Sequence, residues 1–214
     1  MSHSDCLSLP WSPSDAQASV VLVRHGRTSY NRERKFLGRT DIALDERGKA
    51  EVARLAGLGE LCAQVRSSPL TRARQTACAI SEVVLEDPAW RELDQGQLEG
   101  MLPQDAVAAF PEFFRRFQED PGGTPVPGGE SLGTRIEQAR RALDQLGEQG
   151  GVHVVVTHQM VIAGLRCTIA EPSLARWRRY CVPNASVSIL ERRGAAWVEC
   201  VGGWVPVGPD THDV

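Results

Sequence analysis

The chain has 214 residues and a formal net charge of −3, with 42% hydrophobic and 24% charged residues. This length and composition suit a globular protein with one sizeable α/β domain or two small ones. A negative net charge argues against nucleic-acid binding, and no apolar stretch reaches the roughly 20 residues of a membrane helix.

The two ends of the chain differ from the middle. Residues 1–17 combine Ser, Pro and Asp with scattered apolar residues and lack the features of a signal peptide, so they predict a flexible tail that Trp11 is able to pin to the surface. A second tail is expected over residues 206–214, with one domain over residues 18–205. The six cysteines contain no Cys-x-x-Cys pair. This is typical of free thiols in a reducing compartment, so a cytoplasmic protein is expected.

The first half of the chain alternates predicted strands and helices. The apolar run at residues 19–23 predicts a strand, and short strands are also predicted at residues 64–67 and 90–93, the last at a sheet edge. Residues 24–40 predict a basic loop, and a helix follows that is capped near Asp45. A second helix is predicted from Ser68-Pro69 to about residue 84, because a hydroxyl residue followed by proline marks a helix start.

The second half resumes this alternation after an insertion at about residues 96–129. The insertion contains an apolar stripe, which predicts a lid over the sheet edge, a stripe packed on the core, or both: Val107, Phe110, Phe113, Phe114 and Phe117. Residues 130–147 predict the clearest helix, and another helix starts near His158 and ends before Pro172. Strands are predicted at residues 152–156, 186–190 and 196–201, the last two as a hairpin. The element order predicts a three-layer α/β/α sandwich with a mostly parallel central sheet and a small cap.

Two histidines each follow a buried strand directly. His25 ends the segment 20–25 and His158 ends the segment 152–158. In a sheet covered by helices on both faces, the strand ends hold the chemistry. We therefore expect both imidazoles at one sheet edge, although a lone strand-end histidine is more often structural.

The residues around these histidines predict a phosphate site. Arg24 has the planar fork that suits phosphate oxygens, and Gly26 lets the backbone approach a ligand. A neutral imidazole attacks phosphorus once the phosphoryl charge is neutralised. Arg72 lies in the first turn of a predicted helix and is expected to point at the same site, whereas Arg74 is expected on the surface.

A proton donor for the leaving oxygen is expected among three carboxylates. Glu92, Asp94 and Glu99 cluster between the predicted edge strand and the lid. A carboxyl beside a phosphate dianion has a raised pKa and holds a proton near neutral pH. His158 begins a helix, whose N-terminal amides favour an anion. These residues together predict phosphoryl transfer through a histidine.

At this point the sequence resembles the histidine phosphatase superfamily, also called phosphoglycerate mutase-like (branch 1). One Arg-His-Gly triplet is weak evidence, but motifs in the family's order extend over residues 19–201. They are LVRHGRTSYN at 22–31, FLG at 36–38, DIAL at 41–44, SSPLTRA at 67–73, ELDQGQLEG at 92–100, PGGES at 127–131, TH at 157–158 and NASV at 184–187.

The resemblance implies a role for each matched residue. His25 would be the nucleophile that becomes phosphohistidine, and Glu92 would be the general acid and then the base that activates water. Arg24, Arg72 and His158 would bind the phosphoryl group. Further substrate- or phosphate-binding residues would be Thr28, Asn31, Leu37, Gly38 and Gln159. No metal and no cofactor is expected. Gln97-Leu98 stand where the family usually has an aromatic residue, often Trp, and Tyr30 stands where it often has Trp. Both departures concern the substrate more than the chemistry.

The expected function is hydrolysis of a small phosphomonoester, and the alternative is a 2,3-bisphosphoglycerate-dependent phosphoglycerate mutase. Only about 30 residues separate Gly100 from Glu130, and a short lid that admits water favours hydrolysis. The pair Arg115-Arg116 favours the mutase alternative, because it resembles the arginine pair with which mutases hold the substrate carboxylate. The other interpretation of this pair is a solvated helix face.

Two further classes of protein fit the sequence less well. A phosphate-binding pseudoenzyme would have lost His25 or Glu92, and both are present. A phosphorelay domain would place its histidine on a helical bundle. We expect a small-molecule partner, no nucleic acid and no membrane. The late hairpin and residues 177–180 are candidate surfaces for a homodimer.

Overall fold

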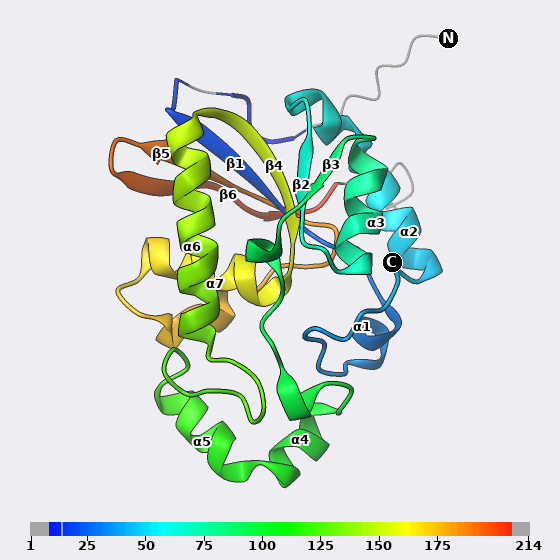
Figure 1. The fold of residues 1–214 in the computed structure, drawn as a ribbon, viewed down its shortest axis with the longest axis vertical. Coiled ribbons are helices and arrows are strands. Elements are labelled where there is room, and N and C mark those ends of the chain that lie inside the picture. Colours follow the sequence, from blue (N-terminus) through cyan, green and yellow to red (C-terminus); the bar gives the residue numbers. More distant parts are fainter. Residues whose placement is uncertain (1–8, 14, 207–214) are drawn as a thin grey trace.

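The computed structural model describes residues 9–13 and 15–206, so most of both predicted tails lies outside the described residues. Its centre is a six-stranded sheet in the order β3-β2-β4-β1-β5-β6 (Figure 1). The strands are β1 (Ala18–Arg24), β2 (Val65–Ser67), β3 (Val84–Glu86), β4 (Gly151–Thr157), β5 (Val187–Arg193) and β6 (Ala196–Trp204). The first four pair in parallel, and β5 is antiparallel to both neighbours. The mostly parallel sheet is therefore confirmed.

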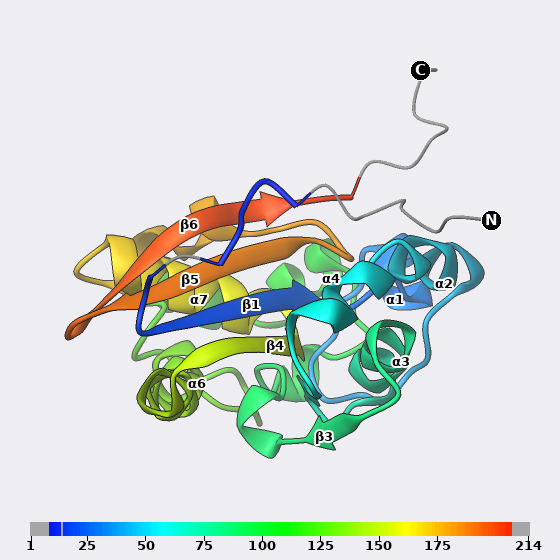
Figure 2. The ribbon, with the colours of Figure 1, turned by 90° about the horizontal axis from the view of Figure 1, so that it is seen from above.

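Helices cover both faces of this sheet. They are α1 (Ser29–Glu33), α2 (Glu46–Ala53), α3 (Thr71–Ile80), α4 (Pro103–Ala109), α5 (Pro111–Glu119), α6 (Leu132–Gln149) and α7 (Gln159–Ala170). Figure 2 shows α2 and α3 on one side and α6 and α7 on the other. The predicted three layers are confirmed.

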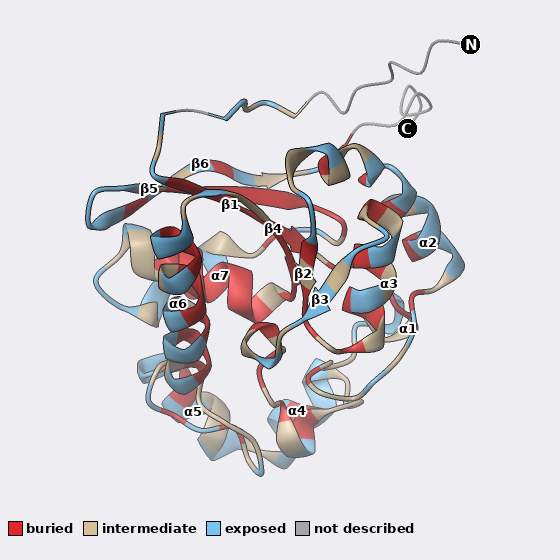
Figure 3. Cartoon of the chain, turned by 45° about the horizontal axis from the view of Figure 1, so that its top comes forward, coloured by how far each residue is buried: buried red, intermediate tan, exposed pale blue. Residues whose placement is uncertain are grey.

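The side chains of β1 point alternately to the two faces of the sheet, which explains why helices cover both faces. Val20 and Leu22 are fully buried in the cluster that includes α6 and α7. Val21 and Val23 are fully buried in the other cluster, with α2 and α3. Successive side chains of a strand point to opposite faces, so a continuous valine run requires apolar partners on both. Figure 3 shows the buried residues along the sheet and on the sheet-facing sides of the helices.

The insertion at residues 96–129, called the lid below, forms α4 and α5 beyond one end of α6 (Figure 1). Phe117 is buried and lies edge-on to Trp177, with ring centroids 6.3 Å apart. Phe110, Phe113 and Phe114 are partly buried against the same core cluster. The aromatic stripe therefore packs on the core.

Three predictions about local structure were wrong. Residues 90–93 form no strand; Pro88–Trp90 is a 3₁₀ helix capped by Asp87, and the edge strand is β3. Helix α3 begins at Thr71 rather than at Ser68-Pro69 and ends at Ile80, where the chain turns into the edge strand. The predicted loop 24–40 contains α1, for which Thr28 and Asn31 form a capping box.

The segment before β1 is anchored to the sheet. The indole nitrogen of Trp11 donates a hydrogen bond of 2.9 Å to Oε1 of Glu191 on β5. The backbone of Gln17 bonds to Arg192 and Gly151. Trp11 therefore does pin this segment to the surface. Among the helices of the described ranges, none is long and apolar enough to cross a membrane.

Candidate active site

The carboxyl ends of three parallel strands meet at one sheet edge. Arg24 of β1 lies opposite Thr157 of β4, and Ser67 of β2 lies opposite Val156. The strands therefore end at the same level, and the next residues emerge together. The rings of His25 and His158 lie with their centroids 5.1 Å apart. The structure thus brings the two predicted histidines side by side.

His25 is held in one neutral form. It is 3% exposed, and its Nδ1 lies 2.8 Å from the carbonyl oxygen of Gly26. A carbonyl only accepts, so Nδ1 holds the ring proton and Nε2 keeps its lone pair. Burial, assisted by the charges of Arg72 and Arg24, lowers the pKa of His25 well below its ordinary value. The imidazole is therefore neutral at neutral pH, with an unprotonated Nε2.

Two guanidinium groups lie beside the histidines, that of the fully buried Arg72 and that of the half-buried Arg24. Arg72 donates from Nη2 to the carbonyl of Gly38 at 2.6 Å and from Nη1 to that of Thr40 at 2.9 Å. Arg24 donates from Nη1 to the carbonyl of Val182. Burial lowers the pKa of each arginine to about 10, so both stay positively charged at neutral pH. Their charges favour an anion at this edge.

Glu92 has the properties of a proton donor. It is 3% exposed, and its oxygens accept from the amides of Leu93 at 2.8 Å and Met160 at 3.2 Å. Burial raises its pKa, although these two hydrogen bonds and the nearby Arg72 and Arg24 act in the opposite direction. The carboxyl is therefore easier to protonate than an exposed glutamate.

The other two clustered carboxylates have different partners. Asp94 pairs with Arg39 at 3.1 Å. Glu99 accepts from the backbone amides of Arg39 and Thr40, both at 2.6 Å, and from the Thr40 hydroxyl. Since the carbonyls of this same loop bind Arg72, Glu99 shapes the loop that positions the arginine.

His158 is fully buried at the N-cap of α7. Its Nε2 lies 2.8 Å from the hydroxyl oxygen of Ser68, and its Nδ1 is buried without a hydrogen-bond partner in the described part of the chain. Burial lowers its pKa well below the ordinary value, and Arg72 and Arg24 act in the same direction. This ring is neutral as well.

The remaining predicted residues surround this centre. Thr28 and Asn31 use their side chains on each other in the capping box of α1, where the Thr28 hydroxyl donates to Oδ1 of Asn31 at 3.0 Å. Gly38 is buried and contributes its carbonyl to Arg72, and Leu37 precedes it in the same loop. Gln159 begins α7, and its Oε1 is buried. Thr28 therefore acts here as a helix cap.

The sequence matches the family described as the histidine phosphatase superfamily (branch 1) over residues 20–201. The chain belongs to this superfamily. It is 31% identical over 187 residues to phosphoserine phosphatase 1 of Hydrogenobacter thermophilus, a match that covers 81% of this chain and 88% of that one. It is 34% identical over 184 residues to phosphoglycerate mutase-like protein 4 of Arabidopsis thaliana, with 81% and 79% covered.

Structural similarity agrees with the superfamily assignment. A mycobacterial glucosyl-3-phosphoglycerate phosphatase solved with VO3 superposes with a TM-score of 0.77 and 27% identity, covering 87% of this chain and 98% of the other. The relatives of this chain are thus named as phosphatases and as mutase-like proteins.

Two further polar residues of this superfamily site, Ser68 and Asn184, are recognisable from their contacts rather than from their positions in the sequence. Ser68 is bonded to His158, although Ser68-Pro69 was interpreted as a helix cap. Asn184 donates from Nδ2 to the carbonyl of His25 at 3.0 Å, and the Ala185 amide donates to the same oxygen at 3.2 Å. The NASV motif was the available signal for Asn184. For Ser68 the signal was the serine pair in SSPLTRA.

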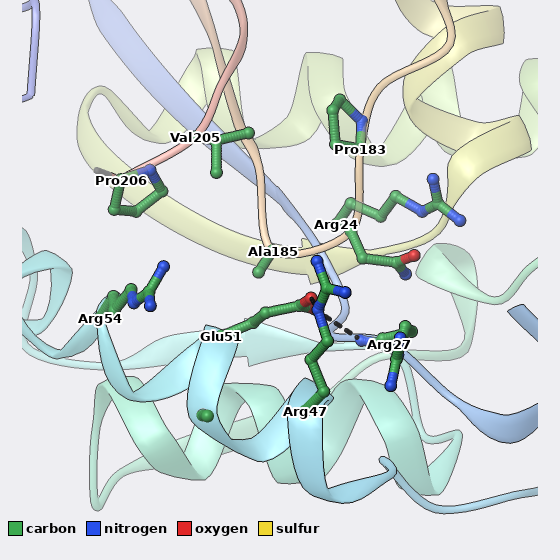
Figure 4. Close-up of a pocket in the computed structure, with 11 residues that line it drawn as sticks. Arg24, Arg27, Arg47, Glu51, Arg54, Pro183, Ala185, Val205 and Pro206 are labelled. Carbon is green, nitrogen blue, oxygen red and sulfur yellow. Dashed lines mark hydrogen bonds and ion pairs between the residues drawn. The ribbon is translucent and has the colours of Figure 1, made fainter. Parts of the chain in front are cut away.

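A concavity of about 570 Å³ lies between α2 and residues 183–185 (Figure 4). The guanidinium of Arg24 points away from Arg47 and Arg54 in this view. Arg47 is paired with Glu51, which lies in the same wall, at 3.1 Å. Arg24 and Asn184 line this pocket, whereas His25, Arg72, Glu92 and His158 do not, so the pocket adjoins the site described above.

Proposed function

We propose that the chain is a metal-independent phosphomonoesterase that acts on a small phosphorylated metabolite through a phosphohistidine at His25. The observation that supports this best is the neutral His25 ring, whose Nδ1 is bound to the Gly26 carbonyl and whose Nε2 lone pair is available beside Arg24 and Arg72. The arginines supply the charge compensation that the phosphoryl group requires.

The first proposed step transfers the phosphoryl group to the enzyme. Arg24, Arg72 and His158 bind its oxygens. Nε2 of His25 forms a bond to phosphorus while the ester P–O bond breaks. Glu92 gives its proton to the leaving oxygen, and burial supports this role because it raises the pKa of the carboxyl. The alcohol then departs with that proton.

The second proposed step hydrolyses the phosphohistidine. The Glu92 carboxylate takes a proton from water while the water oxygen bonds to phosphorus and the P–N bond breaks. His25 returns to its neutral form, and inorganic phosphate leaves. Glu92 is then protonated for the next cycle.

The lid favours hydrolysis over mutase activity. Arg115 pairs with Glu112 at 2.7 Å and Glu119 at 2.8 Å on its own helix, and its side chain is 57% exposed. Arg116 is also exposed. These arginines therefore lie on a solvated helix face, which leaves the mutase alternative without its main support from the sequence.

A paired assay without added metal tests the proposed function. One arm follows phosphate release from an aryl phosphate and a panel of natural monoesters that includes phosphoserine and glucosyl-3-phosphoglycerate. The other arm follows conversion of 3-phosphoglycerate to 2-phosphoglycerate with a bisphosphoglycerate primer. We expect phosphate release without isomerisation, and isomerisation with little release would overturn the proposal in favour of a mutase.

Two histidine variants test the proposed mechanism. His25→Ala is expected to abolish turnover and acid-labile phosphate labelling. His153→Ala is the matched control, because His153 lies half-buried on β4, where its Nε2 is 2.9 Å from the Gly150 carbonyl oxygen, outside the proposed site. Residual turnover in His25→Ala would contradict the phosphohistidine.

We also propose a cytoplasmic location. Cys62, Cys78, Cys167, Cys181 and Cys200 all have free thiols. This supports a reducing compartment. Cell fractionation with an antibody against the chain tests it, and recovery outside the cytosolic fraction would contradict it.

A further inference from the structure

We propose that Ser68 is a positioning residue that fixes the tautomer of His158, so that Nδ1 of His158 presents its proton to the phosphoryl oxygen. The inference rests on the proposed function and deepens it, because it says how the second histidine binds the phosphoryl group without being protonated.

The hydrogen bonds of Ser68 determine where its proton goes. The residue is fully buried, and its backbone amide bonds to the Val156 carbonyl at 3.0 Å. Its hydroxyl oxygen accepts from the Leu70 amide at 3.3 Å and lies 2.8 Å from Nε2 of His158. A buried hydroxyl proton seeks an acceptor, and Nε2 of His158 is the only one in hydrogen-bond contact among the described residues. The hydroxyl therefore donates to Nε2.

The tautomer of His158 follows from this bond. Burial lowers the pKa of His158, with Arg72 and Arg24 nearby, so the ring is neutral and has a single N–H. Since Nε2 accepts from Ser68, the proton is on Nδ1. This atom is buried and without a partner in the described part of the chain. It is the only nitrogen through which the ring can donate to a ligand.

His25 and His158 thus have the same tautomer and opposite uses. In His25, the Nδ1–H donates a hydrogen bond to the Gly26 carbonyl, and the lone pair on Nε2 is available to attack phosphorus. In His158, the lone pair on Nε2 accepts a hydrogen bond from the Ser68 hydroxyl, and the Nδ1–H is available to donate to a phosphoryl oxygen. In the other tautomer, His158 would turn a lone pair toward the phosphoryl oxygen and repel it.

A direct test reads the ring nitrogens by ¹⁵N NMR. The chain has five histidines, so spectra of a His158→Gln variant assign the signal. In the unmodified protein at neutral pH, we expect Nδ1 of His158 protonated and Nε2 unprotonated. In Ser68→Ala, the protonated fraction of Nε2 should rise. A protonated Nε2 in the unmodified protein would overturn the inference even if Ser68→Ala does not fold.

Kinetics supply the second readout. Ser68→Ala is expected to lower kcat by about 10-fold, with KM little changed, because the donor acts on charge that develops in the transition state. Protonated imidazole has a proton on both nitrogens, so the ratio of unmodified to Ser68→Ala rates should narrow as the pH falls. A ratio that is independent of pH would show that Ser68 is only structural.

Two further variants separate the hydroxyl from the local fold. Ser68→Thr retains a hydroxyl and should recover most of the rate. Ser67→Ala is the matched control, because the buried hydroxyl of Ser67 donates to the Ser68 carbonyl and does not contact His158. A loss in Ser67→Ala as large as in Ser68→Ala would overturn the inference.

The two proposals fail in different ways. If His25→Ala retains turnover, the proposed phosphohistidine is wrong, while the NMR result on His158 still decides the tautomer. If the phosphohistidine forms and Ser68→Ala leaves the tautomer and the pH dependence unchanged, the inference about Ser68 alone is wrong.

Discussion

At the level of single residues, the proposed chemistry depends on the protonation of three buried side chains. His25 and His158 have lowered pKa values, and Glu92 has a raised one. In each case burial is the largest cause, because it disfavours the charged form. The site therefore holds two neutral imidazoles and a carboxyl that retains its proton more readily, while Arg24 and Arg72 keep their charge.

The lowered histidine pKa values predict acid sensitivity. Below about pH 6.5 the unfolded chain protonates both histidines while the folded protein does not, so stability falls as the pH falls. Each histidine contributes about 1.4 kcal/mol per pH unit in this range. Denaturant unfolding of His25→Asn between pH 6.5 and 5 should show a shallower decline than the unmodified protein. An equal slope would show that His25 is already protonated in the fold.

The assignment of Glu92 as the acid predicts a dependence on the leaving group. Glu92→Gln cannot donate a proton, so alkyl phosphates, whose leaving oxygens need it most, should lose about 100-fold or more in kcat/KM. An aryl phosphate should lose far less. Asp94→Asn is the control, because Asp94 pairs with Arg39 instead. Equal losses on both ester types would assign the proton transfer to another group.

At the level of elements, the loop at residues 38–40 connects the lid side of the molecule to Arg72. Glu99 binds the amides of Arg39 and Thr40, and the carbonyls of Gly38 and Thr40 bind Arg72. A Cβ atom at Gly38 would lie 2.3 Å from Oε1 of Glu99 and 2.6 Å from the backbone nitrogen of Gln95. Only glycine fits at this position.

Gly38→Ala should therefore displace the loop at residues 38–40 and weaken the hydrogen bonds from Arg72 to its carbonyls. We expect a loss of about 1–3 kcal/mol in the free energy of unfolding from overpacking, with a fall in kcat/KM. Gly122→Ala is the matched control, since its Cβ would meet no atom closer than 3.6 Å, and it should stay within about 0.5 kcal/mol. Urea unfolding measures the free energy of unfolding of both variants. Similar losses in the two would mean that a side chain at position 38 is accommodated without overpacking.

The elements also show where prediction from sequence ends. The strand runs 19–23 and 152–156 were recognisable because a β-branched run buried on both faces has few other interpretations. Ser68-Pro69 has the pattern of a helix start, yet the Ser68 hydroxyl is bonded to His158, far away along the chain. In residues 90–93 apolar and charged side chains are mixed, and Pro88 with the cap at Asp87 makes a 3₁₀ helix at Pro88–Trp90 in place of the predicted strand. Contacts of this kind appear only once the chain is folded.

For the whole molecule, the position of the lid arginines favours the proposed hydrolysis over mutase activity. The lid packs on the core through its aromatic side chains, and Arg115 faces solvent in ion pairs with Glu112 and Glu119. The order of strands and helices was sufficient to predict the layered architecture. The orientation of Arg115 was not predictable, because an arginine at this spacing fits a solvated face and a pocket equally well.

The solvated position predicts that Arg115 has little influence on catalysis. Arg115→Ala should change kcat/KM by less than about two-fold, because exposed ion pairs contribute little. The same assay on Arg116→Ala provides the comparison. A selective loss with substrates that have a carboxylate would place Arg115 at the pocket and restore the mutase alternative.

The position of β1 in the sheet has a consequence for biosynthesis. β1 lies between β4 and β5, so Val23 pairs with Val156 on one side and Val187 on the other. β1 is therefore synthesised long before its two partner strands, β4 and β5. Non-local pairing of this kind slows folding and leaves apolar surface exposed in the meantime. A nascent chain that stops after α7 already contains each residue proposed for catalysis, yet one edge of β1, and with it the support under His25, is still unpaired.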